Sequence, residues 1–156
     1  MNIKTLLTTL VIGLIASVAF IVIQPFFGML TLTSRHAAVY VEVGHYSEEY
    51  AVILAWLLHG TVSIFYTFIS LLIYNVNKSL TVSFLQIIIL GWLTTLIATP
   101  ANEWVIKLIT TGEFTNIFAL SDLNTEIGPK LWLHILFFAL VVVSISLSRL
   151  TAFPKH

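Results

Sequence analysis

Two histidines, His59 and His134, lie inside long runs of apolar residues, where an ionisable side chain is uncommon and is a functional candidate by default. A neutral imidazole in such a place can ligate haem iron or another metal, relay a proton, or hydrogen-bond to a neighbouring helix. Other polar side chains occur in the same runs or just beyond them, namely Gln24, Ser63, Tyr66, Thr94, Thr95 and Asn102. Together with the two histidines they form the candidate site, called the polar cluster.

The elements that carry these residues are predicted from composition. The chain has 156 residues, of which 58% are hydrophobic and 9% charged, and this excludes a soluble globular domain. Residues 5–27, 51–74, 80–99 and 131–148 contain no Asp, Glu, Lys or Arg. Each run reaches or approaches the roughly 20 residues that a membrane-spanning helix needs, and none alternates as a barrel strand would.

We therefore predict an all-α integral membrane protein, with four transmembrane helices in an antiparallel bundle that forms a single domain over residues 1–156. The predicted spans are about 5–27, 48–74, 80–100 and 130–149, and the predicted outer loops are about 28–47 and 101–129.

The charges predict an orientation. Basic residues are dense in the two short tails and the short turn, where they are Lys4, Lys78, Arg149 and Lys155, whereas Arg35, Lys107 and Lys130 are spread over two long loops. By the positive-inside rule, both termini should be cytoplasmic. The acidic residues, which weigh little in that rule, all fall in or beside the long loops: Glu42, Glu48, Glu49, Glu103, Glu113, Asp122 and Glu126.

Helix ends can also be read from the sequence. Ser47 followed by two glutamates predicts the start of the second helix, and Pro129 suits the first turn of the fourth. Beyond Pro100, an apolar face of Trp104, Val105, Leu108 and Ile109 opposes Glu103 and Lys107, and Gly112 predicts a stop. This segment is either an amphipathic helix lying at the outer interface or a continuation of the third span past a kink.

Small and polar residues at helical spacing predict how the helices meet. Gly13 with Thr9 and Ser17, and Gly91 with Thr95 and Ala98, are predicted packing seams. His59, Ser63, Tyr66 and Ser70 form a stripe that should face the bundle interior. By helical rise, His59 lies about 12 Å and His134 about 5 Å below the outer ends of their spans, so the polar cluster should gather beneath the outer loops.

Three interpretations of the polar cluster remain open. His59 and His134 are candidate axial ligands of a b-type haem; His36 and His45 with loop carboxylates are candidate metal or proton ligands; or the cluster is structural and satisfies buried polar groups. The structural interpretation is favoured, and no catalytic residue or metal ligand set is predicted. No carboxylate in a span can orient His59 beside Ser63, and neither a phosphate-binding glycine loop nor a basic patch for nucleic acid occurs.

Part of the chain, from His59 to Arg149, resembles the YagU-like bacterial inner-membrane proteins. The similarity is carried by His59, Ser63, Phe65 and Tyr74, by Pro100 and Trp104, and by Glu126-Ile127-Gly128, Trp132, His134 and Arg149. The family tends to place its histidine before the tryptophan of the last span, whereas Trp132 precedes His134 here. The resemblance implies a bacterial inner membrane and carries no functional residue over.

The sequence thus favours a multi-pass inner-membrane protein with a non-enzymatic accessory, interaction or stress-related role. One alternative is a haem-binding or quinone-linked redox subunit that uses His59 and His134, and another is a small-solute transporter that oligomerises to enclose its pathway. The expected partners are the lipid bilayer and either a second copy of the chain or another membrane protein.

Overall fold

The computed structural model describes residues 3–30, 32–112, 114, 116 and 123–148, and every element in this part of the chain is helical. The order is α1 Ile3–Ile23, the short 3-10 helix η1 Gln24–Phe27, α2 Leu32–Gly44, α3 Glu48–Val76, α4 Leu80–Thr111 and α5 Pro129–Ser148. Four segments are long and apolar enough to cross a membrane, namely Ile3–Phe27, α3, α4 and α5. The predicted all-α membrane bundle is confirmed. Four of the charged residues that bear on the predicted orientation lie outside the described residues, namely Glu113, Asp122, Arg149 and Lys155.

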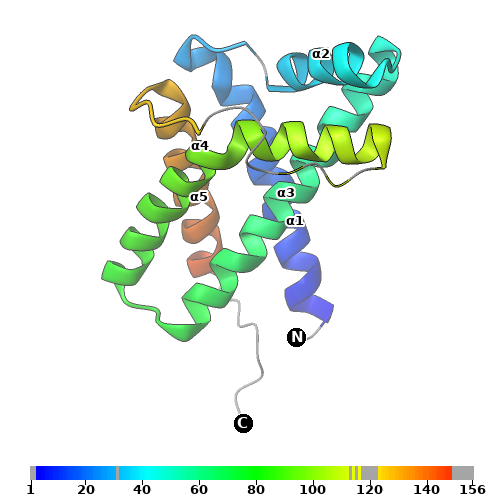
Figure 1. The fold of residues 1–156 in the computed structure, drawn as a ribbon. Helices are drawn as coiled ribbons and strands as arrows, with labels where there is room; N and C mark the ends of the chain where they lie inside the picture. Colours follow the sequence, from blue (N-terminus) through cyan, green and yellow to red (C-terminus); the bar gives the residue numbers. More distant parts are fainter. Residues whose placement is uncertain (1–2, 31, 113, 115, 117–122, 149–156) are drawn as a thin grey trace.

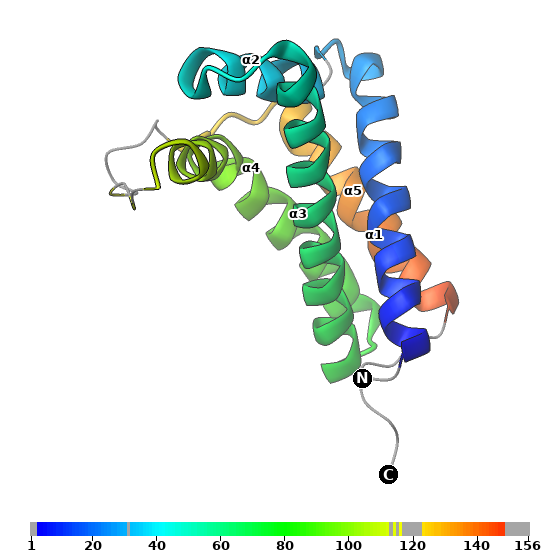
Figure 2. The same cartoon turned by 90° about the vertical axis from the view of Figure 1, so that its right-hand side faces the viewer.

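Successive long helices run in opposite directions (Figures 1 and 2). The start of α1, the α3–α4 turn and the end of α5 lie at one end of the bundle, whereas α2 and the last turns of α4 lie at the other, called the α2 end. Helix α1 packs on α3 and α5, and α4 packs on α5. Although the 77–79 turn joins them, α3 and α4 diverge from it like the arms of a V and touch little (Figure 1).

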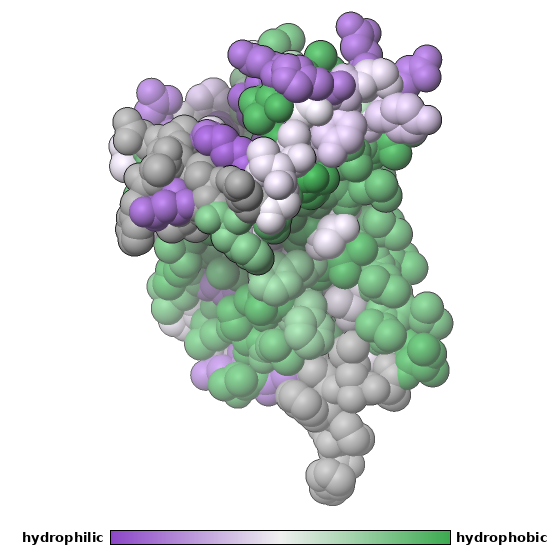
Figure 3. Space-filling view, turned by 45° about the vertical axis from the view of Figure 1, so that its right-hand side comes forward, coloured by the Kyte–Doolittle hydropathy of each residue, from purple (hydrophilic) through white to green (hydrophobic). Residues whose placement is uncertain are grey.

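The surface agrees with a membrane setting. Apolar side chains cover the sides of the long helices, and polar side chains gather over α2 and the end of α4 (Figure 3). Burying the apolar sides of these helices in lipid requires the bilayer to surround them below the α2 end.

Two glycines allow close helix contacts. A Cβ added at Gly13 would lie 2.8 Å from the Cα of Ile64 in α3, and one added at Gly91 would lie 2.9 Å from Cγ1 and 3.1 Å from the Cα of Ile135 in α5. A backbone that approaches this closely leaves no room for a side chain. The predicted seams of α1 and α4 are confirmed at these glycines.

The helix α2 differs from the sequence prediction, which gives a loop over residues 28–47. It is stabilised by tertiary packing: Ala37 and Tyr40 are buried against Ala51 and Ala55 of α3 and Ile106 of α4. Ala37, Tyr40 and Val41 follow the i, i+3, i+4 spacing of an amphipathic helix, a signal that is weak over only 13 residues. As a result, α2 lies across the end of the bundle rather than extending away from it (Figure 2).

Of the two predicted alternatives for the segment after Pro100, the structure shows the continuation of the third span past a bend. Helix α4 continues through Pro100 to Thr111, and its last turns run across the α2 end at a steep angle to its first part (Figures 1 and 2). Proline lacks an amide hydrogen and clashes with the preceding turn, which explains the change of direction there. Lys107 donates to Glu103 at 2.8 Å, and Gly112 ends the helix with φ 69°, both as predicted.

The predicted apolar face of this segment is wrong in one respect. Ile106, which was not assigned to that face, has 0% exposure and packs under α2, whereas Ile109, which was assigned to it, is exposed. The position of α2 determines which side of the helix is covered. At the other predicted boundaries, α3 begins at Glu48 after an extended Ser47 whose side chain makes no capping hydrogen bond, and α5 begins at Pro129.

Candidate functional site

A cavity of about 470 Å³ lies at the α2 end of the bundle, within the range of about 300–1,000 Å³ usual for small-molecule sites. All five α-helices contribute to its wall, because α3 and α4 diverge here and α2 crosses above them. Most of the wall is apolar. The polar-cluster residues that line it are Gln24, His59, Ser63, Tyr66, Thr94, Asn102 and His134.

Thr95, the remaining member of the polar cluster, is buried behind this wall and forms a hydrogen bond with His134. Its hydroxyl donates to the carbonyl of Gly91 at 2.8 Å, and its oxygen lies 2.9 Å from Nδ1 of His134. A hydroxyl has a single proton, so with that proton donated to Gly91 the Thr95 oxygen accepts from Nδ1–H of His134. In that tautomer of the neutral imidazole, Nε2 of His134 is a hydrogen-bond acceptor.

His59 and His134 both lie against Phe20. The centroid of the Phe20 ring is 5.1 Å from that of His59 and 5.3 Å from that of His134. The Phe20 ring is therefore about equally distant from the two imidazoles. If both histidines ligated the iron of a haem, the porphyrin would lie midway between them, in the space that Phe20 occupies. Phe20 is buried there, so the residues as placed do not fit haem.

Several buried polar atoms at the cavity have no hydrogen-bond partner among the described residues. They are Nδ1 of His36, Nε2 of His59, Oγ1 of Thr94 and Oδ1 of Asn102. An unpaired buried polar atom costs about 1–3 kcal/mol, so a native protein seldom retains four around one space unless something fills it. These atoms give the cavity hydrogen-bonding capacity that its own walls do not use.

His36 is neutral in this environment. Burial, the positive charges of Arg35 and Lys130 and the neighbouring His59 together lower its pKa from 6.5 to about 4, with burial the largest cause. The metal interpretation treats His36 as a loop ligand. In the structure His36 belongs to α2, and it lines the cavity because α2 is folded over the cavity. His45, Glu42, Glu48 and Glu49, which were considered with it, do not line the cavity.

No group of three or more His, Cys, Asp or Glu side chains in the described part of the chain is arranged to hold a metal ion. The ligand set of the metal interpretation is therefore not assembled there.

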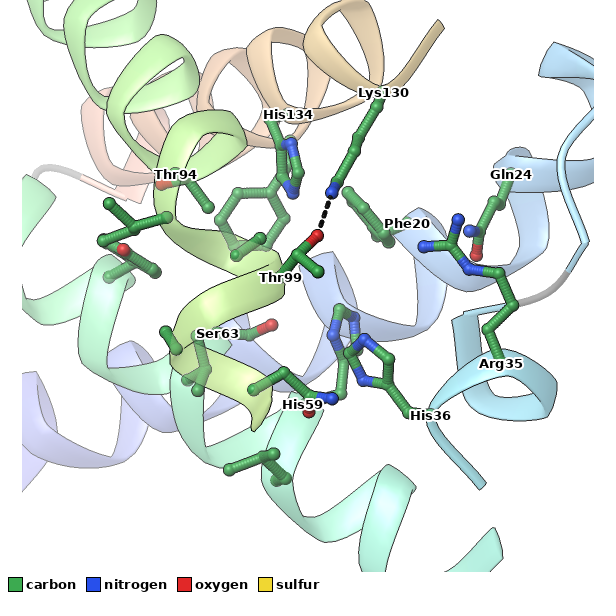
Figure 4. Close-up of a pocket in the computed structure, with 18 of the residues that line it drawn as sticks. Phe20, Gln24, Arg35, His36, His59, Ser63, Thr94, Thr99, Lys130 and His134 are labelled. Carbon is green, nitrogen blue, oxygen red and sulfur yellow. Dashed lines mark hydrogen bonds between the residues drawn. The ribbon is translucent and has the colours of Figure 1, made fainter. Parts of the chain in front are cut away.

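Two basic residues that the positive-inside rule assigns to the outer loops, Arg35 and Lys130, also line the cavity. Lys130, in the first turn of α5, donates from Nζ to Oγ1 of Thr99 at 2.8 Å (Figure 4). Arg35 extends from α2 toward the same space, where its guanidinium lies near Gln24 (Figure 4). Lys130 directly precedes an apolar run and Arg35 lies in the segment between two runs, but nothing in the sequence shows that they converge, because convergence depends on how α2 docks.

Comparisons of the chain with protein-family models, with curated proteins and with solved structures find no match. The similarity to YagU-like proteins stays a prediction. The function must therefore be argued from the cavity itself.

Proposed function

We propose that the protein is a non-enzymatic accessory component of the membrane that holds a small amphipathic molecule in the cavity at the α2 end. The observation that carries this proposal is a cavity with mainly apolar walls and four buried polar atoms that have no partner among the described residues. Apolar walls favour a hydrocarbon part of the ligand, and the unpaired atoms favour a polar part.

Binding fits these side chains better than catalysis does. A nucleophile needs a base that is itself oriented by a third group, and the described residues lining the cavity include no carboxylate to do so for His59 or His134. The hydroxyl of Thr95 orients His134 instead, with no charge to stabilise an imidazolium. Such an arrangement holds a neutral imidazole in one orientation at the cavity.

For the location, we propose the bacterial inner membrane, with both termini in the cytoplasm and the α2 end outside. Lys4 and Lys78 lie in short segments at the end opposite α2, whereas Arg35, Lys107 and Lys130 are spread over the longer segments at the α2 end. The greater density of basic residues supports a cytoplasmic position for the end opposite α2. Alkaline phosphatase fused to the C-terminus is therefore expected to be inactive in cells. An active fusion would reverse the orientation.

The proposed ligand is tested by extracting small molecules from the purified protein and identifying them by mass spectrometry. We expect the wild-type protein to retain a specific amphipathic molecule and Ala98→Phe to lose it, because Ala98 lines the cavity and a phenyl ring would fill much of it. Val143→Phe is the matched control, because Val143 of α5 is exposed and lies outside the cavity wall.

The same extraction separates the competing functions. Recovery of the same molecules from wild type and Ala98→Phe would sink the proposal. An isoprenoid quinone that is present in the wild type and lost from Ala98→Phe would support a bound amphiphile and move the role to the redox alternative.

A further inference from the structure

The two cations at the cavity come from different helices, and their side chains extend toward the same region of the cavity. Arg35 belongs to α2 and Lys130 to α5, and Figure 4 shows both side chains extending toward the region between Gln24, His36 and Thr99. They are close enough to interact electrostatically with each other and with His36. Like charges that converge beside an apolar wall repel, and the repulsion grows as the local dielectric constant falls.

The described residues that line the cavity include no acidic side chain to balance these charges. Glu126 lies near enough to Lys130 to interact with it, but Glu126 is exposed and is not part of the wall. Lys130 uses the neutral hydroxyl of Thr99 as its acceptor within the cavity. Among the described residues, no negative charge lies on the inner side of the two cations, and an anionic ligand would supply one.

Partly exposed apolar side chains line the side of the cavity between α3 and α4. Val62 of α3 and Ile97 of α4 both line it, and they are 39% and 42% exposed. They lie on the two helices that diverge from the 77–79 turn and make few contacts with each other, so direct helix packing does not close this side of the cavity (Figure 1). An apolar chain can leave the cavity between these residues without entering water.

We propose that the occupant is a membrane amphiphile with an anionic head group, whose head lies between Arg35 and Lys130 and whose acyl chain extends between Val62 and Ile97. This rests on the proposed function and specifies its ligand. The guanidinium of Arg35 and the ammonium of Lys130 supply charge-assisted hydrogen bonds to a carboxylate or phosphate, and Asn102 and His36 contribute neutral polar groups beside them.

The experiment measures the affinity of the full-length protein, in a neutral detergent at pH 8, for pyrene-labelled dodecanoic acid and for its methyl ester. The two probes share one chain and differ in charge. We expect the acid to bind about tenfold more tightly, and Lys130→Gln or Arg35→Gln to weaken the acid about tenfold while leaving the ester unchanged. Lys130→Arg, which keeps the charge, should retain tight binding and shows that position 130 tolerates substitution.

Lys107→Gln is the matched control, since Lys107 lies at the same end of the bundle but pairs with Glu103 and does not line the cavity. Equal affinities of acid and ester, both abolished by Ala98→Phe, would overturn the anionic head group and leave the proposed function standing. Binding of neither probe would overturn both. If Lys107→Gln weakened binding of the acid as much as Lys130→Gln does, the preference for the acid would come from the general surface charge. That result would overturn the proposed position of the head group.

Competition identifies the source of the anion. Displacement of the acid by oleate alone assigns a fatty acid, and displacement by phosphatidylglycerol assigns an anionic phospholipid; both support the proposal. Displacement by phosphatidylcholine to the same extent, or by inorganic phosphate alone, would contradict it, because the first lacks a net negative charge and the second lacks the chain.

Discussion

Gly91→Leu is expected to destabilise the protein by about 3 kcal/mol or more, as measured by reversible unfolding of the detergent-solubilised chain. A Cβ at this position would lie 2.9 Å from Cγ1 of Ile135 and 3.1 Å from both its Cα and its nitrogen. Two of these three atoms belong to the backbone of α5, which cannot move aside as the end of a side chain can. The substitution must therefore separate α4 from α5.

The same seam positions part of the site. Thr95 lies one turn after Gly91, and its partner His134 precedes Ile135, so separation of the two helices breaks the hydrogen bond that fixes the imidazole. We expect Gly91→Leu to lose the bound amphiphile as well as stability.

Gly60→Ala provides the matched control. A Cβ added at Gly60 would have only the flexible Cδ2 of Leu14 nearby, at 3.7 Å, and alanine is about 1 kcal/mol better than glycine inside a helix. Gly60→Ala should therefore leave stability unchanged or raise it, whereas Gly91→Ala should lower it. Equal effects of these two alanines would contradict the close α4–α5 contact.

Tyr40→Ala is expected to lower the free energy of unfolding by about 3–5 kcal/mol, the usual range for removing a large buried aromatic ring. Tyr40 is the largest fully buried side chain of the described residues, with 0% exposure. Its ring packs among Ala37, Ala51, Ala55 and Ile106, where it joins α2 to α3 and to the end of α4. Without it, α2 should detach and carry Arg35 and His36 away from the cavity.

Tyr40→Phe should act in the opposite direction. The hydroxyl of Tyr40 is buried and has no hydrogen-bond partner among the described residues, and burial raises the pKa of this phenol. Removing the hydroxyl while keeping the ring removes an unsatisfied group, so stability should rise by about 1 kcal/mol. Increased protease cleavage within residues 28–47 should accompany Tyr40→Ala alone. Equal protection of both variants would show that Tyr40 does not hold α2 in place.

The bundle and much of the polar cluster could be predicted from the sequence because their causes are local. Runs without charge can only cross the bilayer as helices, and the helical rise places both His59 and His134 in the outer half of their spans. Gly13 and Gly91 were recognisable as seams because small residues at four-residue spacing permit close contact. Each of these inferences needs only the residues of a single helix.

The remaining parts of the site depend on tertiary contacts. Whether residues 32–44 form a helix, and which way Arg35 points, follow from the docking of Tyr40 onto α3 and α4. The burial of Ile106 rather than Ile109 has the same origin. The cavity itself arises where α3 and α4 diverge, and a short turn between two apolar runs indicates only that they are neighbours. No single-helix pattern contains this information.

The most direct test of a ligand cavity at the α2 end is native mass spectrometry of the protein released from its own membrane, measured for wild type beside Ala98→Phe and Val143→Phe. We predict that wild type and Val143→Phe each carry one bound amphiphile per chain, and that Ala98→Phe carries none. A wild-type chain that emerges without a bound molecule, or an Ala98→Phe chain that retains the same one, would contradict it.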